Sequence, residues 1–303
     1  MGILTGKRVL ITGAGGFIGS HIIKRLLKEG AGIYALDKKD ITAAGIFYFH
    51  ADICDRTSLG AAIISINPQI IVHLAACLDK NASEVEMMRI NYQGTANLID
   101  ALESMPYERF VYISTSELYF GNGVPFSEQM PLHPQAAYAR SKLMAEEYCM
   151  RQFNEKSKPI TILRPSIVYG PGQAGSMFIP QCITSALKGE DMKMTAGEQT
   201  RDFVYVEDVV EAILKGSYVP AAAGEIINIG SGIETTLKAA ALKINELAGK
   251  TMRIDFGALP YRENEIWHYV LDIEKAKTTL GWQPLTAFAE GLRATLLSYR
   301  QPL

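Results

Sequence analysis

The sequence contains few cysteines and no cysteine pair of the kind that binds metal. Cys54, Cys77, Cys149 and Cys182 are spread over 303 residues, and none forms a C-x-x-C motif. Four such widely spaced cysteines do not indicate a disulfide framework, and no zinc or redox motif is present. We therefore expect reduced thiols in a cytoplasmic protein, and no metal site.

The sequence also lacks a strong charge bias and a long apolar run. Its 30 basic and 32 acidic residues give a net charge of −2, with no basic block that would favour nucleic acid as a partner. No apolar run approaches the roughly 18 residues of a membrane span, and no signal-peptide pattern opens the chain. We expect neither secretion nor a membrane partner.

Short apolar runs alternate with segments of helical spacing. The runs lie at 9–12, 33–36, 46–50, 70–74, 110–113 and 160–163, and the helical patterns at 18–27, 58–66, 85–104 and 137–153. Strands that alternate with helices favour a parallel sheet covered on both faces. The predicted fold class is α/β, a Rossmann-type doubly wound sheet.

Regular alternation ends after residue 163, where glycine and proline punctuate 165–180. We expect a dinucleotide-binding domain over 1–165 and a smaller substrate domain that occupies mainly 166–303. The run at 225–230 has the composition of a buried strand. It predicts that 225–232 returns to the sheet and that the two domains are interleaved.

A glycine-rich turn links the first predicted strand to the first helix. Glycines there permit a tight turn and let the backbone approach a pyrophosphate, which the helix N-terminus also attracts. Asp37, 18 residues beyond Gly19, ends the second strand, where a carboxylate binds ribose hydroxyls. A turn without a ligand is the alternative. The predicted contacts are Gly13, Gly16, Phe17, Ile18, Gly19 and Asp37.

The charge of Asp37 favours NAD over NADP, because a carboxylate repels a 2′-phosphate, although Lys38 and Lys39 lie beside it. Two further segments extend the predicted cofactor site. Asp52 and Ile53 follow the third strand and could hold the adenine edge, with a surface turn as the alternative. Small residues end the fourth strand, where a cofactor could lie flat; these positions are Leu74, Ala75 and Ala76.

Tyr138 and Lys142 lie four residues apart on a predicted helix, so one turn separates them on one face. A lysine in that position can lower the pKa of the phenol and so prepare it for acid–base work. Ser114 and Thr115 follow the fifth strand, at the edge where parallel sheets bind ligands. Thr115 could hold the hydroxyl that loses its proton to Tyr138; capping of a loop is the alternative.

The chain resembles the NAD-dependent epimerase/dehydratase branch of the extended short-chain dehydrogenase/reductases, which act on nucleotide sugars. The resemblance covers nearly the whole chain. It rests on Tyr138-x-x-x-Lys142 and on residues 12–19, 73–76, 91–98, 163–165, 168–173, 201–209 and 280–284.

The resemblance implies tightly held NAD, a nucleoside-diphosphate sugar as substrate, and catalysis by Thr115, Tyr138 and Lys142. It adds Asn91, Ser114 and Pro165 to the expected cofactor contacts. It also implies that Arg201 and Arg262 clamp the diphosphate, since a guanidinium binds such groups through two donors, and that Ser116 and Phe178 line the substrate pocket. The alternatives are ion pairs for the arginines and core packing for Phe178.

Several reactions fit this resemblance. An epimerase that oxidises the sugar transiently at C4 is our first expectation. Glu117 resembles the glutamate of dehydratases and decarboxylases, so it is either a base for such a reaction or a loop carboxylate. A 4-ketoreductase is the third possibility, and a catalytically silent dinucleotide-sensing protein the last.

Two positions depart from the family pattern. Ile167 stands where family members often carry an asparagine, and Phe120 lies where one residue looks inserted. The helices expected at 85–104 and 137–153 resemble those that pair two subunits in this family, which implies a homodimer; their apolar faces fit an intrachain core as well.

Overall fold

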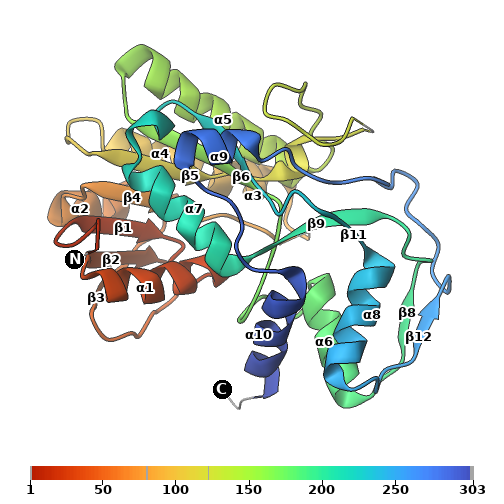
Figure 1. The fold of residues 1–303 in the computed structure, drawn as a ribbon. Coiled ribbons are helices and arrows are strands. Elements are labelled where there is room, and N and C mark those ends of the chain that lie inside the picture. The colour runs from red at the N-terminus through yellow and green to blue at the C-terminus, as the bar shows by residue number, and fades with distance from the viewer. Residues whose placement is uncertain (1, 80, 122, 301–303) are drawn as a thin grey trace.

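A computed structural model describes residues 2–79, 81–121 and 123–300. Seven parallel strands form the central sheet in the order β10-β6-β5-β4-β1-β2-β3 (Figure 1). The order reverses direction beside β1, as in a doubly wound sheet. The prediction of a Rossmann-type α/β fold is confirmed. The strands are β1 (Arg8–Thr12), β2 (Gly32–Asp37), β3 (Ile46–His50), β4 (Ile70–His73), β5 (Arg109–Ile113), β6 (Ile160–Pro165) and β10 (Ile226–Ile229).

Helices cover both faces of this sheet. Ile11 and Val72 belong to the core beneath one set of helices, and their chain neighbours Leu10 and Ile71 to the core beneath the other. This division follows from the alternation of side chains along a strand. The first set is α1 (Phe17–Glu29), α7 (Val206–Tyr218) and α9 (Glu274–Leu280); the second is α2 (Arg56–Ile66), α4 (Gly94–Ala101) and α5 (Ala137–Lys156).

The segment expected to be one helix at 85–104 is interrupted. It consists of α3 (Glu84–Met87), a π-helical turn η1 (Met88–Gln93) and α4. Asn91, within the π turn, is 1 % exposed; its Oδ1 accepts from the Cys77 amide at 2.6 Å and its Nδ2 donates to Ser141 Oγ at 2.9 Å. Such turns occur frequently at functional sites. Here the turn carries a side chain that joins the loop after β4 to α5.

A second lobe lies beside the sheet (Figure 1) and has its own apolar core around Ile183, Phe203 and Ile244. Its sheets are β11-β9-β7 and β12-β8. The elements are β7 (Ile167–Tyr169), α6 (Phe178–Lys188), β8 (Met192–Met194), β9 (Thr200–Tyr205), β11 (Glu234–Thr236), α8 (Leu237–Ala248), β12 (Ile254–Phe256) and α10 (Phe288–Arg300). The short 3-10 turns are η2 (Ser116–Leu118) and η3 (Pro220–Ala222).

The chain crosses between the two lobes more than once. β10 pairs with β6 in the central sheet, with Ile227 opposite Leu163. Trp282, 2 % exposed, belongs to the core beneath α7 and donates its indole N–H to the Asp208 carbonyl at 2.9 Å. The domain division at residue 165 stays a prediction.

Within the described ranges, no helix combines the length and apolar character that a bilayer crossing requires.

Candidate active site

The glycine turn after β1 has no room for side chains at two positions. Gly13 has a φ of +68°, and a Cβ there would lie 2.7 Å from the Ala75 amide nitrogen. A Cβ at Gly19 would lie 2.6 Å from the Gly13 carbonyl oxygen. Glycine is therefore required both for the left-handed backbone and for the contact between the turn, α1 and the loop after β4.

The N-terminus of α1 faces this turn without a side-chain cap. Gly16 is its N-cap residue, so no hydroxyl or carboxylate of that residue accepts from the first helical N–H groups. An uncapped helix start of this kind suits a phosphate. Asp37, at the end of β2, accepts from the Gly15 amide at 2.9 Å and the Lys39 amide at 3.0 Å, which fixes its carboxylate beside the turn.

A buried chain of hydrogen bonds ties β1 and β4 to the π turn. His73 contacts Thr12 Oγ1 at 2.6 Å through Nδ1 and Thr95 Oγ1 at 2.9 Å through Nε2. The Thr95 hydroxyl donates to the Asn91 carbonyl, so Nε2 must carry the proton and Nδ1 must accept from Thr12. Burial lowers the pKa of His73 to about 3, which keeps the ring neutral.

The other predicted cofactor positions lie at the carboxyl edge of the sheet or in the loops that follow it. Asp52 accepts from the Cys54 amide at 2.8 Å, and Ile53 is buried so closely against α4 that a Cβ at Gly94 would lie 2.5 Å from it. Pro165 is the last residue of β6. Leu74, Ala75 and Ala76 follow β4 directly. Direct cofactor contacts at these residues, and at Asn91, Phe17 and Ile18, stay predictions.

Two buried hydroxyls at this edge have no hydrogen-bond partner in the described part of the chain. Ser114 Oγ follows β5 and Ser166 Oγ follows β6, and the two residues are 3 % and 8 % exposed. A buried hydroxyl without a partner is costly and calls for an explanation. Together with the glycine turn, these orphaned groups fit a polar ligand that lies across the strand ends, as a dinucleotide would.

Thr115 and Tyr138 meet where β5 ends. Thr115 is the N-cap of η2 and accepts from the Glu117 amide at 3.1 Å, which leaves its hydroxyl proton available to interact with the Tyr138 phenol. Burial raises the pKa of Tyr138, the charge of Glu117 raises it further, and the Thr115 hydrogen bond opposes both. Burial and Glu117 therefore favour the protonated phenol, and the Thr115 hydroxyl favours the phenolate.

Lys142 lies one turn along α5 and points into the sheet. Its Nζ donates to the Ile113 carbonyl at 2.5 Å and lies 4.2 Å from the centre of the Tyr112 ring. Burial lowers the pKa of Lys142 to about 7, and the charge of Glu146 opposes that shift. The ammonium is thus close to balance between its charged and neutral forms near neutral pH.

The two predicted diphosphate arginines differ in their surroundings. Arg201 on β9 donates through Nη1 to the carbonyls of Thr200 and Ile266, at 2.6 and 2.8 Å, and pairs through Nη2 with Glu265 at 2.5 Å. Arg262 is exposed and makes no hydrogen bond or ion pair within the residues that the structure describes. The ion pair considered for both arginines is present at Arg201 alone.

Tyr269 was not predicted from the sequence as a site residue; it is 5 % exposed and donates to Ser116 Oγ at 2.7 Å. These residues are 153 positions apart, so no local pattern connects them. The charge of Glu117 adds to burial in raising the pKa of Tyr269, as it does at Tyr138.

Phe178 begins α6 and stacks on Phe203 with ring centres 6.3 Å apart, in the core of the second lobe.

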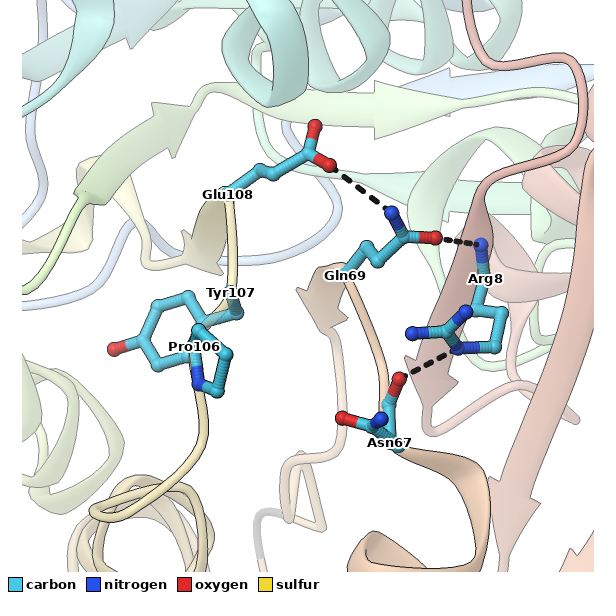
Figure 2. Close-up of a pocket in the computed structure, with 6 residues that line it drawn as sticks. All are labelled: Arg8, Asn67, Gln69, Pro106, Tyr107 and Glu108. Carbon is cyan, nitrogen blue, oxygen red and sulfur yellow. Dashed lines mark hydrogen bonds between the residues drawn. The ribbon is translucent and has the colours of Figure 1, made fainter.

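A pocket at the opposite edge of the sheet has a different character (Figure 2). Arg8 begins β1, while Gln69 and Glu108 immediately precede β4 and β5, so these are amino ends of strands. Gln69 accepts from the Arg8 amide and donates to Glu108, both at 3.1 Å. Ligands of open parallel sheets bind at the carboxyl edge, and the candidate site lies there. The pocket is lined by Arg8, Asn67, Gln69, Pro106, Tyr107 and Glu108.

Comparison with known proteins identifies the family. The model of the NAD dependent epimerase/dehydratase family matches residues 9–230. The chain belongs to this family. The prediction drawn from the motifs is therefore confirmed.

Two curated relatives cover 97 % of this chain at 32 % identity. One is a UDP-glucose 4-epimerase of Mycolicibacterium smegmatis, of which 98 % is covered. The other is a human dTDP-D-glucose 4,6-dehydratase, of which 90 % is covered. Relatives at equal identity thus carry different reactions, and identity alone does not select one.

A solved structure has the same fold. The UDP-glucose 4-epimerase of Thermus thermophilus, in complex with NAD, matches with a TM-score of 0.88 at 28 % identity over 97 % of this chain and 99 % of that one. Among the described residues of the present chain, no group of three or more histidine, cysteine, aspartate or glutamate side chains could hold a metal ion.

Proposed function

We propose that this protein is an NAD-dependent nucleotide-sugar epimerase that oxidises its sugar transiently at C4. The observation that carries the proposal is that the Thr115 hydroxyl interacts with the Tyr138 phenol at the carboxyl end of β5, with Lys142 one turn away. An acid–base phenol beside a hydroxyl that orients the substrate is the arrangement needed to take a proton from a sugar hydroxyl and return it.

The proposed proton path uses three side chains. Thr115 orients the C4 hydroxyl, and the Tyr138 phenolate oxygen takes its proton as the C4–H bond breaks. The Lys142 ammonium favours that phenolate against the opposing effects of burial and Glu117. Bound NAD would supply the hydride acceptor and donor. Tyr138 gives the proton back after the ketone is reduced on its other face.

The residues that would hold NAD belong to the first 165 positions. The turn at Gly13, Gly16 and Gly19 would receive the pyrophosphate, and Asp37 the adenosine ribose. The carboxylate of Asp37 is held 2.9 Å from the Gly15 amide, so a 2′-phosphate there would meet a fixed negative charge. This supports NAD over NADP. Ser114, with its unpartnered hydroxyl, supports a polar contact near the nicotinamide end.

The second lobe would supply the nucleoside-diphosphate site. We propose that Arg201 and Arg262 bind the diphosphate and that Ser116 and Phe178 border the sugar and nucleotide. Arg201 already makes three hydrogen bonds within the protein. It can bind the diphosphate only if Glu265 releases the Arg201 guanidinium. The exposed Arg262 is available without such a rearrangement.

The experiment that tests this function needs purified protein and a set of nucleotide sugars. Denaturation should release NAD, identified by chromatography and absorbance, and native protein should convert UDP-glucose or another nucleotide sugar to an isomer of unchanged mass. Release of no nicotinamide cofactor, with no conversion of UDP-, dTDP-, GDP- or CDP-sugars, would contradict the proposal. Stoichiometric consumption of NADPH or NADH with a keto-sugar would indicate a 4-ketoreductase.

The position of Glu117 favours a second candidate function. Its charge raises the pKa of both Tyr138 and Tyr269, so the carboxylate lies within electrostatic reach of the two phenols. A carboxylate so placed could remove a second proton from an oxidised sugar, as a dehydratase or decarboxylase requires. Loss of water or carbon dioxide in the product mass would select this reaction over epimerisation.

We propose that the protein acts as a homodimer through α3, η1 and α5. Val85 and Met144 on these elements are 78 % and 38 % exposed, and Tyr92 and Tyr148 contact each other edge to face with ring centres 6.3 Å apart. Exposed apolar side chains gathered on two helices support pairing with a second copy. Light scattering after size-exclusion chromatography should give twice the chain mass, and Val85→Glu should give the mass of one chain.

A further inference from the structure

α5 carries a row of three functional groups on one face. Tyr138, Lys142 and Glu146 are spaced four apart, so each lies one helical turn from the next. Lys142 and Glu146 are both 2 % exposed and face the sheet. The row thus continues past the Tyr138–Lys142 pair to a buried carboxylate that the proposed proton path does not use.

Arg164 on β6 holds that carboxylate through several bonds. Its Nε donates to the two Glu146 oxygens at 3.0 and 3.2 Å, and its Nη2 donates to Oε2 at 2.7 Å. Its Nη1 donates to the Tyr119 hydroxyl at 2.7 Å, which in turn donates to Asn228 Oδ1 at 2.8 Å. The carboxylate is therefore fixed in position by Arg164 on β6, and Arg164 is itself held by Tyr119, just after η2, and through it by Asn228 on β10.

Stability alone is a weak reason for such a pair. The side chains of Arg164 and Glu146 are 3 % and 2 % exposed, and removing both charges from water costs free energy that their attraction often fails to recover. Packed apolar residues of similar volume would commonly serve the fold equally well. The Glu146 carboxylate is held in one position, one helical turn from the buried Lys142 ammonium. This placement suggests that the Arg164–Glu146 ion pair affects the charge of Lys142.

We propose that Glu146, clamped by Arg164, is a positioning residue that keeps the Lys142 side chain charged and in place beneath Tyr138. The inference rests on the proposed function, in which the Lys142 ammonium supports the Tyr138 phenolate. Arg164 then limits how strongly the Glu146 carboxylate stabilises the Lys142 ammonium. Its positive charge offsets part of the negative charge of Glu146 at Lys142.

The other groups around Lys142 do not supply this charge. On β5, Tyr112 presents a buried phenol whose pKa is raised well above its usual value, and on β4 His73 is neutral. Cys149 on α5 has a thiol whose pKa burial raises, so it stays protonated at neutral pH. Burial lowers the pKa of Lys142 to about 7, and Glu146 is the largest influence in the opposite direction.

The two partners of the ion pair predict opposite effects. Glu146→Gln removes the negative charge and leaves Arg164 in place, so the pKa of Lys142 should fall by roughly one to two units. Arg164→Gln removes the offsetting positive charge, so the pKa of Lys142 should rise. A purely structural role predicts that both substitutions loosen the site and shift Lys142 in the same direction or not at all.

The titration is measured directly on the full-length protein by carbon NMR of lysine labelled at Cε, with Lys142→Met to assign the resonance. Glu147→Gln is the matched control, because Glu147 lies next to Glu146 but is exposed, and it should leave Lys142 unchanged. Shifts of opposite sign in the two variants support the inference; equal or absent shifts in folded variants overturn it.

A double variant covers the case in which a single substitution prevents folding. Glu146→Gln with Arg164→Gln removes both charges, and the pKa of Lys142 should still fall, because Glu146 has the larger influence on that pKa. An unchanged pKa in the double variant overturns the inference. The measurement needs no substrate, so failure to convert any nucleotide sugar would count against the proposed function and leave this result standing on its own.

Discussion

The two sides of the candidate site are built differently. On the cofactor side, His73, Asn91 and Lys142 are buried, and their polar atoms are bonded to strands, loops and helices of the central sheet. On the proposed substrate side, Arg201 and Glu265 form an ion pair, and Glu265 belongs to the irregular stretch between β12 and α9. The first side is assembled in advance, whereas on the second Arg201 would have to exchange partners to bind a diphosphate as we propose.

This difference follows from where the backbone bonds are made. Strand ends of a parallel sheet are held by the neighbouring strands, so groups placed there keep their geometry. A loop makes fewer such bonds and moves at lower cost. Rigid placement suits proton transfer, which fails when groups are misplaced by a small distance. An exchangeable ion pair suits binding and release.

The largest effect is expected at the centre of the rigid side. Tyr138→Phe removes the proton donor and acceptor while leaving the ring, so turnover should fall by about 10³-fold or more, with the cofactor still bound. The rate of nucleotide-sugar conversion and the cofactor released on denaturation measure the two effects. Tyr148→Phe is a control on the same helix, because its hydroxyl binds Asp100 outside the site. Near-normal turnover in Tyr138→Phe would remove this residue from the mechanism.

The glycine turn offers a second test of rigidity. Gly13→Ala places a Cβ 2.7 Å from the Ala75 amide nitrogen at a positive φ, so the free energy of unfolding should fall by about 1–3 kcal/mol or more. Gly60→Ala is the matched control: it lies in α2 with open space around the new Cβ, and should raise that free energy by about 0.5–1 kcal/mol. Urea unfolding measures both. Equal effects would show that the turn tolerates a side chain.

The buried His73 makes the rigid side sensitive to acid. Its pKa in the fold is about 3, below the value near 6.5 expected in the unfolded chain. Between those values the unfolded chain binds more protons, so the free energy of unfolding falls as the pH falls, by about 2 kcal/mol from pH 7 to pH 5. His73→Gln should be less stable at pH 7 but should lose less on acidification. An equal loss in both proteins would assign the acid sensitivity to other groups.

The sequence predicted where the groups of the rigid side lie in the fold because their signals are local. Glycines at 13, 16 and 19 lie within one turn, and Tyr138 and Lys142 within one helical turn, so strand and helix spacing alone bring them to the correct edge. The same reasoning could have found Glu146, one turn beyond Lys142, had the row on α5 been followed further.

The remainder of the site depends on contacts that no local pattern contains. Tyr269 reaches Ser116 across 153 positions, and Arg201 reaches Glu265 across 64. Both pairs depend on how segments far apart in the sequence pack together in the fold. The π turn at η1 was also missed, because its apolar spacing resembles that of an ordinary α-helix.

The smallest expected effect tests the exchangeable side. Glu265→Gln keeps a side chain of similar size but removes the charge that binds the Arg201 guanidinium. A nucleoside diphosphate should then compete for Arg201 more easily. KM for the nucleotide sugar should fall by roughly 3- to 10-fold, with kcat little changed. Glu263→Gln, two residues away and exposed, should leave KM unchanged. A rise in KM for Glu265→Gln would mean that the carboxylate aligns Arg201 for the diphosphate and does not compete with it, and the contrast between the two sides of the site would then disappear.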